Sequence, residues 1–298
     1  MDPINPFQKP GQWYKGALHI HTTCSDGNLT PEEVIAEYQR RGYHFLAVTD
    51  HDRITDLTRF NTNGFLTIPS VEVCYDWNSV GQGYHLVALG AREMIDLPRE
   101  TPIRRAIKHW TDRAATVLLA HPYWSGMTSA EMMALEELSG LEIFNLSSHT
   151  DLGKGLSTVH WDHVLTRDKR WWGYAVDDAH WVRQNGRMYD AFGAWVWVKA
   201  ERLEQSLILE ALQQGLFYSS TGPLIHSFHV EDGNASVRCS DVSTINFIGQ
   251  TERGSQRRAE PGHTIDQASH RIVGDEIYLR AECLNAEGRT AWTNPFFL

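Results

Sequence analysis

His19-Ile20-His21-Thr22-Thr23-Cys24-Ser25-Asp26-Gly27 places two imidazoles and a carboxylate within nine consecutive residues. Residues 16–21 are predicted to form the first strand, and residues i and i+2 of a strand project from the same face. His19 and His21 are therefore expected to lie together. Gly27 permits a sharp turn that brings Asp26 back over the strand end. A lone pair of histidines would more simply be a hydrogen-bonded pair on a half-buried strand, so a metal site requires further ligands.

The composition indicates a globular chain with a full hydrophobic core. Its 298 residues, 42% of them hydrophobic, are enough for one large domain or for a large and a small one. The net charge of −10 argues against bulk nucleic-acid binding, which requires an excess of Lys and Arg. No apolar run reaches membrane-spanning length, so we expect no membrane partner.

The cysteines favour a reducing compartment. Cys24, Cys74, Cys239 and Cys283 form no CxxC pair, and the N-terminal residues lack the pattern of a signal peptide. We therefore expect a cytoplasmic protein with reduced thiols. A disulfide between Cys239 and Cys283 stays open as an alternative.

Strand and helix signals alternate through the first three quarters of the chain. The apolar run 45–49 is typical of a strand buried on both faces and is followed by Asp50-His51-Asp52. Capping boxes at 30–33 and 128–131 predict helices that end at Gly42 and Gly140. Such alternation predicts βα units around a parallel sheet. Because polar residues recur at the strand ends, we expect a distorted TIM-like β/α barrel rather than an open sheet.

The pattern changes after Thr221-Gly222-Pro223. Short alternating runs separated by turn residues replace the helical signals. Residues 224–298 are therefore predicted to form a small antiparallel β-sandwich, as an accessory domain to the barrel of residues 1–223.

Nine potential metal ligands stand at predicted strand ends. They are His19, His21, Asp26, His51, Glu72, His85, His121, Asp178 and His180. One zinc ion needs three or four protein ligands, so nine would hold two or three ions if one ligand bridges. Glu72 is the expected bridge because a carboxylate has two oxygens. The mixture of His and carboxylate favours Mn, Fe or Zn over Ca.

The order of these motifs resembles that of a known family. HxHTxxSDG, TDHD, a strand Glu, AHP and DAH follow one another as in the PHP (polymerase and histidinol phosphatase) family of metallohydrolases. Residues 215–223 are similar to a segment of its CehA/McbA-like branch. The resemblance covers residues 16–223 and implies a (β/α)7 barrel with two or three metals.

The resemblance also implies how the ligands are shared. His19, His21, Glu72 and Asp178 would hold one ion, Glu72, His85 and His121 a second, and Asp26, His51 and His180 a third. Asp178 is preferred to Asp177 because its spacing to His180 matches DxH.

We expect a metal-dependent hydrolase that cleaves a small phosphomonoester or phosphodiester through a metal-bridging hydroxide. Glu72 is predicted to act as the bridge, and His180 or His51 as the acid that assists the leaving group. Arg53, Asn145 and Arg183 are the candidate substrate contacts. A small, phosphorylated molecule is the expected partner, and a homo-oligomer is compatible with the sequence.

Two other functions stay open. The same hydroxide can attack a carbonyl carbon, so a carbamate, ester or amide hydrolase is the first alternative. The second is a non-catalytic, metal-bound regulatory or binding protein, which would be expected to lack some of the ligands.

Overall fold

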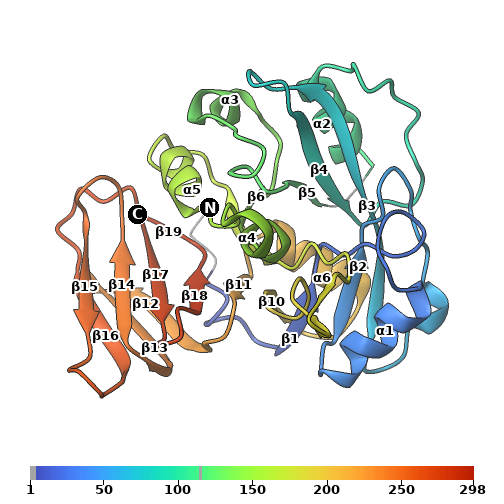
Figure 1. Ribbon diagram of the computed structural model, residues 1–298. Coiled ribbons are helices and arrows are strands. Elements are labelled where there is room, and N and C mark those ends of the chain that lie inside the picture. Colours follow the sequence, from blue (N-terminus) through green and yellow to red (C-terminus); the bar gives the residue numbers. More distant parts are fainter. Residues whose placement is uncertain (1–4, 114–115) are drawn as a thin grey trace.

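A mixed α/β architecture is seen in the computed structural model, which describes residues 5–113 and 116–298 (Figure 1). One continuous sheet runs through both halves of the molecule. Its strand order is β15-β14-β17-β18-β11-β10-β1-β2-β3-β4-β5-β6-β7. The C-terminal strands form one lobe of the molecule, and the N-terminal strands and the helices form the other (Figure 1).

Seven strands of the N-terminal lobe carry the candidate site. They are β1 (Gln12–Ala17), β2 (Phe45–Val48), β3 (Leu66–Trp77), β4 (Gly83–Leu89), β5 (Thr116–Leu119), β6 (Gly140–Asn145) and β7 (Trp172–Val176). Strands β1, β2 and β3 are parallel, as are β5, β6 and β7. Strand β4 runs antiparallel to both of its neighbours, so the prediction of a uniformly parallel sheet is wrong at this strand. The link between β3 and β4 is too short for the crossover that a parallel pair requires.

The sheet curves until its two ends approach each other beyond β1 and β7. Short links join them there: Ile20 bridges Ala179, and the Asp178 amide donates to the His19 carbonyl at 3.0 Å. On the other side of β1, strands β10 (Trp195–Ala200) and β11 (Phe217–Ser220) are added in antiparallel fashion. The described strands form no closed ladder, so a closed barrel is not confirmed.

The helices begin where their caps predict. Thr30 and Glu33 form a capping box for α1 (Pro31–Arg40), and Gly42 follows this helix with a φ of 72°. The second capping box, of Thr128 and Glu131, starts α3 (Ser129–Ala134). The prediction that this helix continues to Gly140 is wrong: the chain leaves the helix at Leu135, and Gly140 starts β6.

The remaining helices pack around the curved sheet. They are α2 (Ile103–Thr111), α4 (Leu146–Leu152), α5 (Thr158–Leu165), α6 (Gln205–Gln213) and the 3-10 turn η1 (Thr58–Phe60). Helix α2 lies against β3, β4 and β5, and α6 packs into the apolar cluster inside the curve. A hairpin of two short strands, β8 (Arg183–Gln184) and β9 (Arg187–Met188), follows β7. Inside the curve, Leu18, Phe45, Val87, Leu118 and Tyr174 are fully buried in one apolar cluster. This core supports the strand ends from below.

All strand pairs in the described part of the C-terminal lobe are antiparallel. A three-stranded sheet of β12 (Ile225–Glu231), β13 (Asn234–Val242) and β16 (Ile265–Arg271) packs against the end of the main sheet. That end consists of β14 (Thr244–Ile248), β15 (Gly254–Arg258), β17 (Tyr278–Leu284), β18 (Thr290–Thr293) and β19 (Phe296–Phe297). Because β18 pairs with β11, the two lobes share backbone hydrogen bonds, and the division at residue 223 stays a prediction.

Two smaller observations concern the expected environment. None of the helices in the described ranges is long and apolar enough to cross a membrane. All four cysteines are free thiols in this structure, and Cys239 and Cys283 are buried.

Candidate metal centre

His19 and His21 stand just beyond β1, where the two ends of the curved sheet meet. Both rings are fully buried, and their Nε2 atoms lie 3.2 Å apart. The His21 amide donates to the Ala179 carbonyl at 2.9 Å, so the residues after β7 hold this segment. The predicted strand over residues 16–21 is wrong in its bounds, because β1 ends at Ala17. The convergence of the two imidazoles is nevertheless confirmed.

Four donor atoms form the innermost set. His19 Nε2 lies 3.0 Å from Glu72 Oε2 and 3.2 Å from Asp178 Oδ1. His21 Nε2 lies 3.2 Å from Glu72 Oε2 and 3.1 Å from Asp178 Oδ1. A metal bound at about 2.0–2.2 Å holds neighbouring ligand atoms about 3.0–3.5 Å apart, so this spacing fits one ion. Asp178 Oδ1 is buried and makes no hydrogen bond within the described chain, which also fits a missing cation.

The second set uses the other oxygen of Glu72. His85 Nδ1 lies 2.8 Å from Glu72 Oε1, and His121 Nε2 lies 3.3 Å from the same oxygen. His85 is near the start of β4, and because β4 is antiparallel its start lies at the end where the parallel strands finish. Glu72 thus presents one oxygen to each set, which is the geometry of a bridging carboxylate.

The third set is more open to solvent. Asp26 Oδ2 lies 3.5 Å from His51 Nε2 and 3.5 Å from His180 Nε2. His21 Nδ1 lies 3.4 Å from Asp26 Oδ1, so His21 belongs to this set as well as to the first. The side chains of His51 and His180 are 35% and 24% exposed, so both can reach a molecule in the cavity.

Backbone strain accompanies these positions. Asp52, His121 and Asp178 have φ values of 51°, 27° and 55°, in a backbone region that residues other than glycine seldom adopt. All three follow strands at the same end of the sheet. Strain of this kind persists where surrounding structure fixes it and is concentrated at functional sites.

Glu142 supports the ligands from behind and was not predicted as a site residue. Its Oε1 lies 2.6 Å from His19 Nδ1, and its Oε2 accepts the His121 amide at 2.8 Å. A carboxylate behind a ligating imidazole fixes the tautomer and the orientation of the ring. A signal was present in the sequence: Glu142 is a lone charge inside the fully buried strand β6.

Asn145 also lies behind the ligands. Its Nδ2 donates to Asp178 Oδ2 at 3.0 Å and to Glu142 Oε2 at 2.9 Å, and the residue is fully buried. It is not among the residues that line the cavity. The structure thus gives the predicted substrate contact Asn145 a position suited to orienting Asp178.

Two further carboxylates hold backbone rather than ligand atoms. Asp177 accepts hydrogen bonds from the Tyr38 hydroxyl and the amides of Phe192, Gly193 and Ala194 at 2.8–2.9 Å. This geometry agrees with the choice of Asp178 as the candidate ligand. Asp50, a member of TDHD with no predicted role, accepts from the Thr22 amide and hydroxyl and from the Ser25 hydroxyl.

The carboxylates dominate the electrostatics. Burial alone would lower the pKa of His19, but Asp178, Glu72 and Glu142 outweigh it and raise this pKa well above its usual value. Despite burial, Asp178 and Glu72 raise the pKa of His21 to about 9. Cys74 and Glu72 likewise outweigh burial and raise the pKa of His85 to about 10. Burial opposes ionisation of Glu72 and Asp178, but the imidazoles hold both pKa values well below normal. The metal-free site therefore attracts positive charge, which divalent ions would supply.

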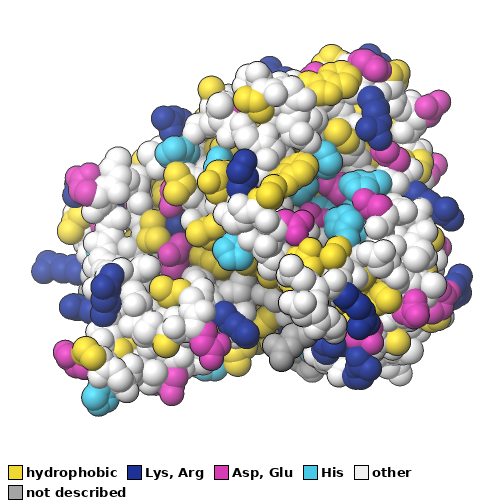
Figure 2. All heavy atoms as spheres, viewed as in Figure 1, with side chains coloured by type: hydrophobic (Ala, Val, Ile, Leu, Met, Phe, Trp, Pro, Cys, Tyr) yellow, Lys and Arg dark blue, Asp and Glu magenta, His cyan; other side chains and the backbone are white. Residues whose placement is uncertain are grey.

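A cavity of about 420 Å³ opens above the ligands. Figure 2 shows histidine and acidic side chains gathered in a hollow of the surface. The lining residues are Asp26, Asn28, His51, Glu72, His85, His121, Trp124, Ser147, Ser148, Asp151, Asp178, His180 and Val182. The predicted substrate contacts Arg53 and Arg183 are exposed and lie outside this lining.

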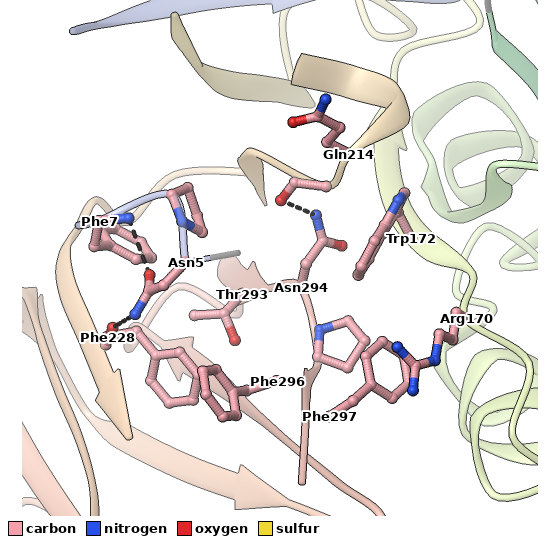
Figure 3. Close-up of a pocket in the computed structure, with 13 residues that line it drawn as sticks. Asn5, Phe7, Arg170, Trp172, Gln214, Phe228, Thr293, Asn294, Phe296 and Phe297 are labelled. Atoms are coloured by element: carbon pink, nitrogen blue, oxygen red, sulfur yellow. Dashed lines mark hydrogen bonds between the residues drawn. The ribbon is translucent and has the colours of Figure 1, made fainter. Parts of the chain in front are cut away.

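A second cavity, of about 210 Å³, lies between the two lobes (Figure 3). Aromatic side chains from distant segments line it, among them Trp172, Phe228 and Phe297. The side-chain amide of Asn294 is already hydrogen-bonded within the chain, since it donates to the carbonyls of Gly215 and Phe217. This cavity is more apolar than the first but offers no set of metal donors among its lining residues, so we place the candidate chemistry in the first.

Comparisons with known proteins agree with a PHP-like fold. No family model matches the sequence. A crystal structure of a two-domain Bacteroides vulgatus protein containing a predicted PHP-like metal-dependent phosphoesterase aligns over 93% of both chains, with a TM-score of 0.52 and 14% identity. At this identity the likeness concerns the fold alone.

Two curated proteins are similar over short segments. A 5′-3′ exoribonuclease of Haemophilus influenzae is 36% identical over 76 residues, or 24% of this chain. A phosphoribosyl 1,2-cyclic phosphate 1,2-diphosphodiesterase of Eggerthella lenta is 36% identical over 81 residues, or 26% of this chain. The chain spans 27% and 30% of the lengths of these relatives.

Proposed function

We propose that this protein is a metal-dependent phosphoesterase of PHP type. The observation that carries the proposal is the pair of buried donor sets that share Glu72, whose two oxygens face different groups of imidazoles. The short similarity to a phosphodiesterase and the PHP-like fold support the same class. The CehA/McbA-like branch, the (β/α)7 barrel and the cytoplasmic location remain proposals of finer detail.

The residues present fit two or three divalent ions, and their mixed donors favour Mn, Fe or Zn. His19, His21, Glu72 and Asp178 would hold one ion and Glu72, His85 and His121 another, with Asp26, His51 and His180 available for a third. When bound, such ions activate water near neutral pH and neutralise charge on phosphoryl oxygens.

Other residues of the protein would position the metal ligands and supply a proton. Glu142 and Asn145 fix His19 and Asp178 from behind, so the buried ligands keep their geometry without substrate. His51 and His180 border the cavity on its solvent side. Either imidazole can deliver a proton to the departing oxygen, unless metal binding occupies its nitrogen.

The test is removal and return of metal. Chelation should abolish cleavage of bis-p-nitrophenyl phosphate, and addition of Mn²⁺, Fe²⁺ or Zn²⁺ should restore it. Cleavage of an aryl carbamate but of no phosphate ester by the reloaded protein would instead establish the carbonyl hydrolase alternative. Tight metal binding without any hydrolysis would favour a regulatory protein.

A further inference from the structure

The part of the cavity lining that is not made of candidate metal ligands contains no cationic side chain among the described residues. Its residues are Asn28, Trp124, Ser147, Ser148, Asp151 and Val182, and no Lys or Arg occurs among the described lining residues. The arginines that follow ligand motifs, Arg53 and Arg183, are exposed outside the lining. A substrate group on this side therefore meets hydroxyls, an indole, an amide and one carboxylate.

The absence of Lys and Arg side chains matters because metal ions held by the donor sets would neutralise charge only on the reacting phosphoryl group. A second phosphate or carboxylate on the substrate would need its own donors, which proteins usually supply with Arg or Lys. Asp151 would instead repel it. The Tyr189 hydroxyl donates to Asp151 Oδ1 at 2.9 Å, so this carboxylate is held in place.

Trp124 gives the same side an apolar face. A tight turn places it there, because the Ser125 amide donates to the His121 carbonyl at 3.1 Å. The indole meets the ring of His121 edge-on at 5.0 Å and that of His85 at 6.1 Å. It is half-buried, so part of the ring faces the cavity directly beside the second ligand set.

The neutral donors complete the surface. The side-chain hydroxyls of Ser147 and Ser148, on α4, make no hydrogen bond within the described residues, although both line the cavity. They are available to the hydroxyl or ester oxygens of an uncharged group. An indole beside two hydroxyls suits a flat or ring-shaped substituent.

We propose, on the basis of the phosphoesterase function above, that the substrate is a monoanionic phosphodiester whose second substituent is uncharged and lies against Trp124. Its single negative charge would be directed to the metal ligands. The substituent would occupy the side bordered by Asp151 and Ser147. Phosphomonoesters, which lack the substituent that would lie against Trp124, and diesters that carry an additional phosphate would be poorer substrates.

A matched set of chromogenic esters tests this proposal on the metal-loaded protein. The set consists of bis-p-nitrophenyl phosphate, p-nitrophenyl phosphate, and the p-nitrophenyl ester of thymidine 5′-phosphate with and without a 3′-phosphate. We expect kcat/KM for bis-p-nitrophenyl phosphate to exceed that for p-nitrophenyl phosphate by at least about tenfold, and the 3′-phosphate to lower kcat/KM by a similar factor. Equal or better cleavage of the more highly charged esters overturns this inference but leaves the phosphoesterase function intact. Absence of any phosphate-ester cleavage overturns both.

Variants of Asp151 and Trp124 test whether these residues select the uncharged substituent. Asp151→Lys should raise kcat/KM for the 3′-phosphorylated ester relative to its unphosphorylated partner by about tenfold, and Asp151→Asn should do so by less. Tyr189→Phe removes the hydrogen bond that positions Asp151 but keeps its charge, so it should change this ratio less than Asp151→Asn does. Trp124→Ala should lower kcat/KM for bis-p-nitrophenyl phosphate about tenfold but that for methyl p-nitrophenyl phosphate much less. Equal losses for both diesters, or no change of the ratio in Asp151→Lys, would contradict the proposed contacts.

Discussion

Two cavities in the described part of this protein are built from opposite kinds of side chain. The cavity above the strand ends is lined by imidazoles and carboxylates, and the cavity between the lobes is lined by aromatic rings. In the second, polar groups such as the Asn294 amide have partners within the chain. In the first, Asp178 Oδ1 is buried without one.

This difference teaches where to look for chemistry. Burial of an aromatic ring is favourable by itself, so the cavity between the lobes needs no function to explain it. Burial of carboxylates costs free energy unless counter-charges compensate. Glu72 and Asp178 are therefore informative because a structural role alone does not account for their convergence with His19 and His21.

The largest expected effect comes from breaking the bridge. Glu72→Gln leaves the shape of the side chain but removes the charge shared by two donor sets, so we expect kcat/KM to fall more than about 1,000-fold, with loss of bound metal. Elemental analysis and steady-state kinetics measure both. Glu287→Gln, on an exposed turn of the C-terminal lobe, is the matched control. Normal turnover in Glu72→Gln would show that the two sets are not one centre.

Substitutions of the neighbouring residues Asp178 and Asp177 are expected to have different effects, because the first is a candidate metal ligand and the second binds backbone amides. Asp178→Asn should lower metal content and turnover while the protein stays folded, since it removes a charged ligand of the first donor set but keeps the shape of the side chain. Asp177→Asn should keep the ligands but place an amide against backbone donors, at a cost of about 3 kcal/mol in unfolding free energy. Denaturant unfolding and metal analysis of both variants distinguish the roles. Identical behaviour of the two variants would contradict this division.

The residue behind the ligands should have an intermediate effect. Glu142→Gln weakens the orientation of His19 and is expected to reduce metal affinity or kcat/KM by about 10–100-fold. Metal titration in competition with a chromogenic chelator measures the first quantity. Glu142 would be only a structural charge if the variant lost stability but kept its metal affinity.

The sequence could predict which side chains converge, because extended backbone places His19 beside His21 and the strand ends gather the other candidate ligands. It could not predict that β4 runs antiparallel, since a strand has the same apolar pattern in either direction. Nor did it indicate the short helices α4 and α5, which pack only a few apolar residues each.

The supporting residues were harder to predict than the ligands. Glu142 and Asn145 contact ligands that are distant in the sequence, so the position of Asn145 at a strand end and the lone charge of Glu142 in a buried strand did not reveal their partners. Arg53 and Arg183 were chosen for their proximity in sequence to ligand motifs, but the chain directs them away from the cavity lining. Closeness to a motif along the chain is thus a weaker guide than position at a strand end.

A smaller effect concerns the metal-free protein and pH. The pKa values of His21 and His85 are raised to about 9 and about 10 from 6.5, so their protonated forms stabilise the folded chain. This contribution is complete below about pH 6.5 and is lost as pH rises through about 9–10. Thermal unfolding in the presence of a chelator should therefore show a falling Tm between pH 7 and 10. The metal-loaded protein should show a smaller fall, and equal curves would contradict the proposed competition between protons and metal.

The smallest effect on turnover is expected at the cavity between the lobes. Phe228→Ala removes a buried ring there and should lower the unfolding free energy by about 3 kcal/mol. Its kcat/KM should stay within about twofold of the parent value, because the ring has no contact with the metal donors. A large loss of turnover in a folded Phe228→Ala protein would show that the two cavities are coupled.

The most direct test of the central claim is the number of metal ions per chain, measured by elemental analysis on untagged, folded protein. The account predicts two or three ions of Mn, Fe or Zn per chain, and fewer in Glu72→Gln. A folded parent protein that binds one ion or none after incubation with these metals would show that the donor sets around Glu72 are not a multinuclear centre.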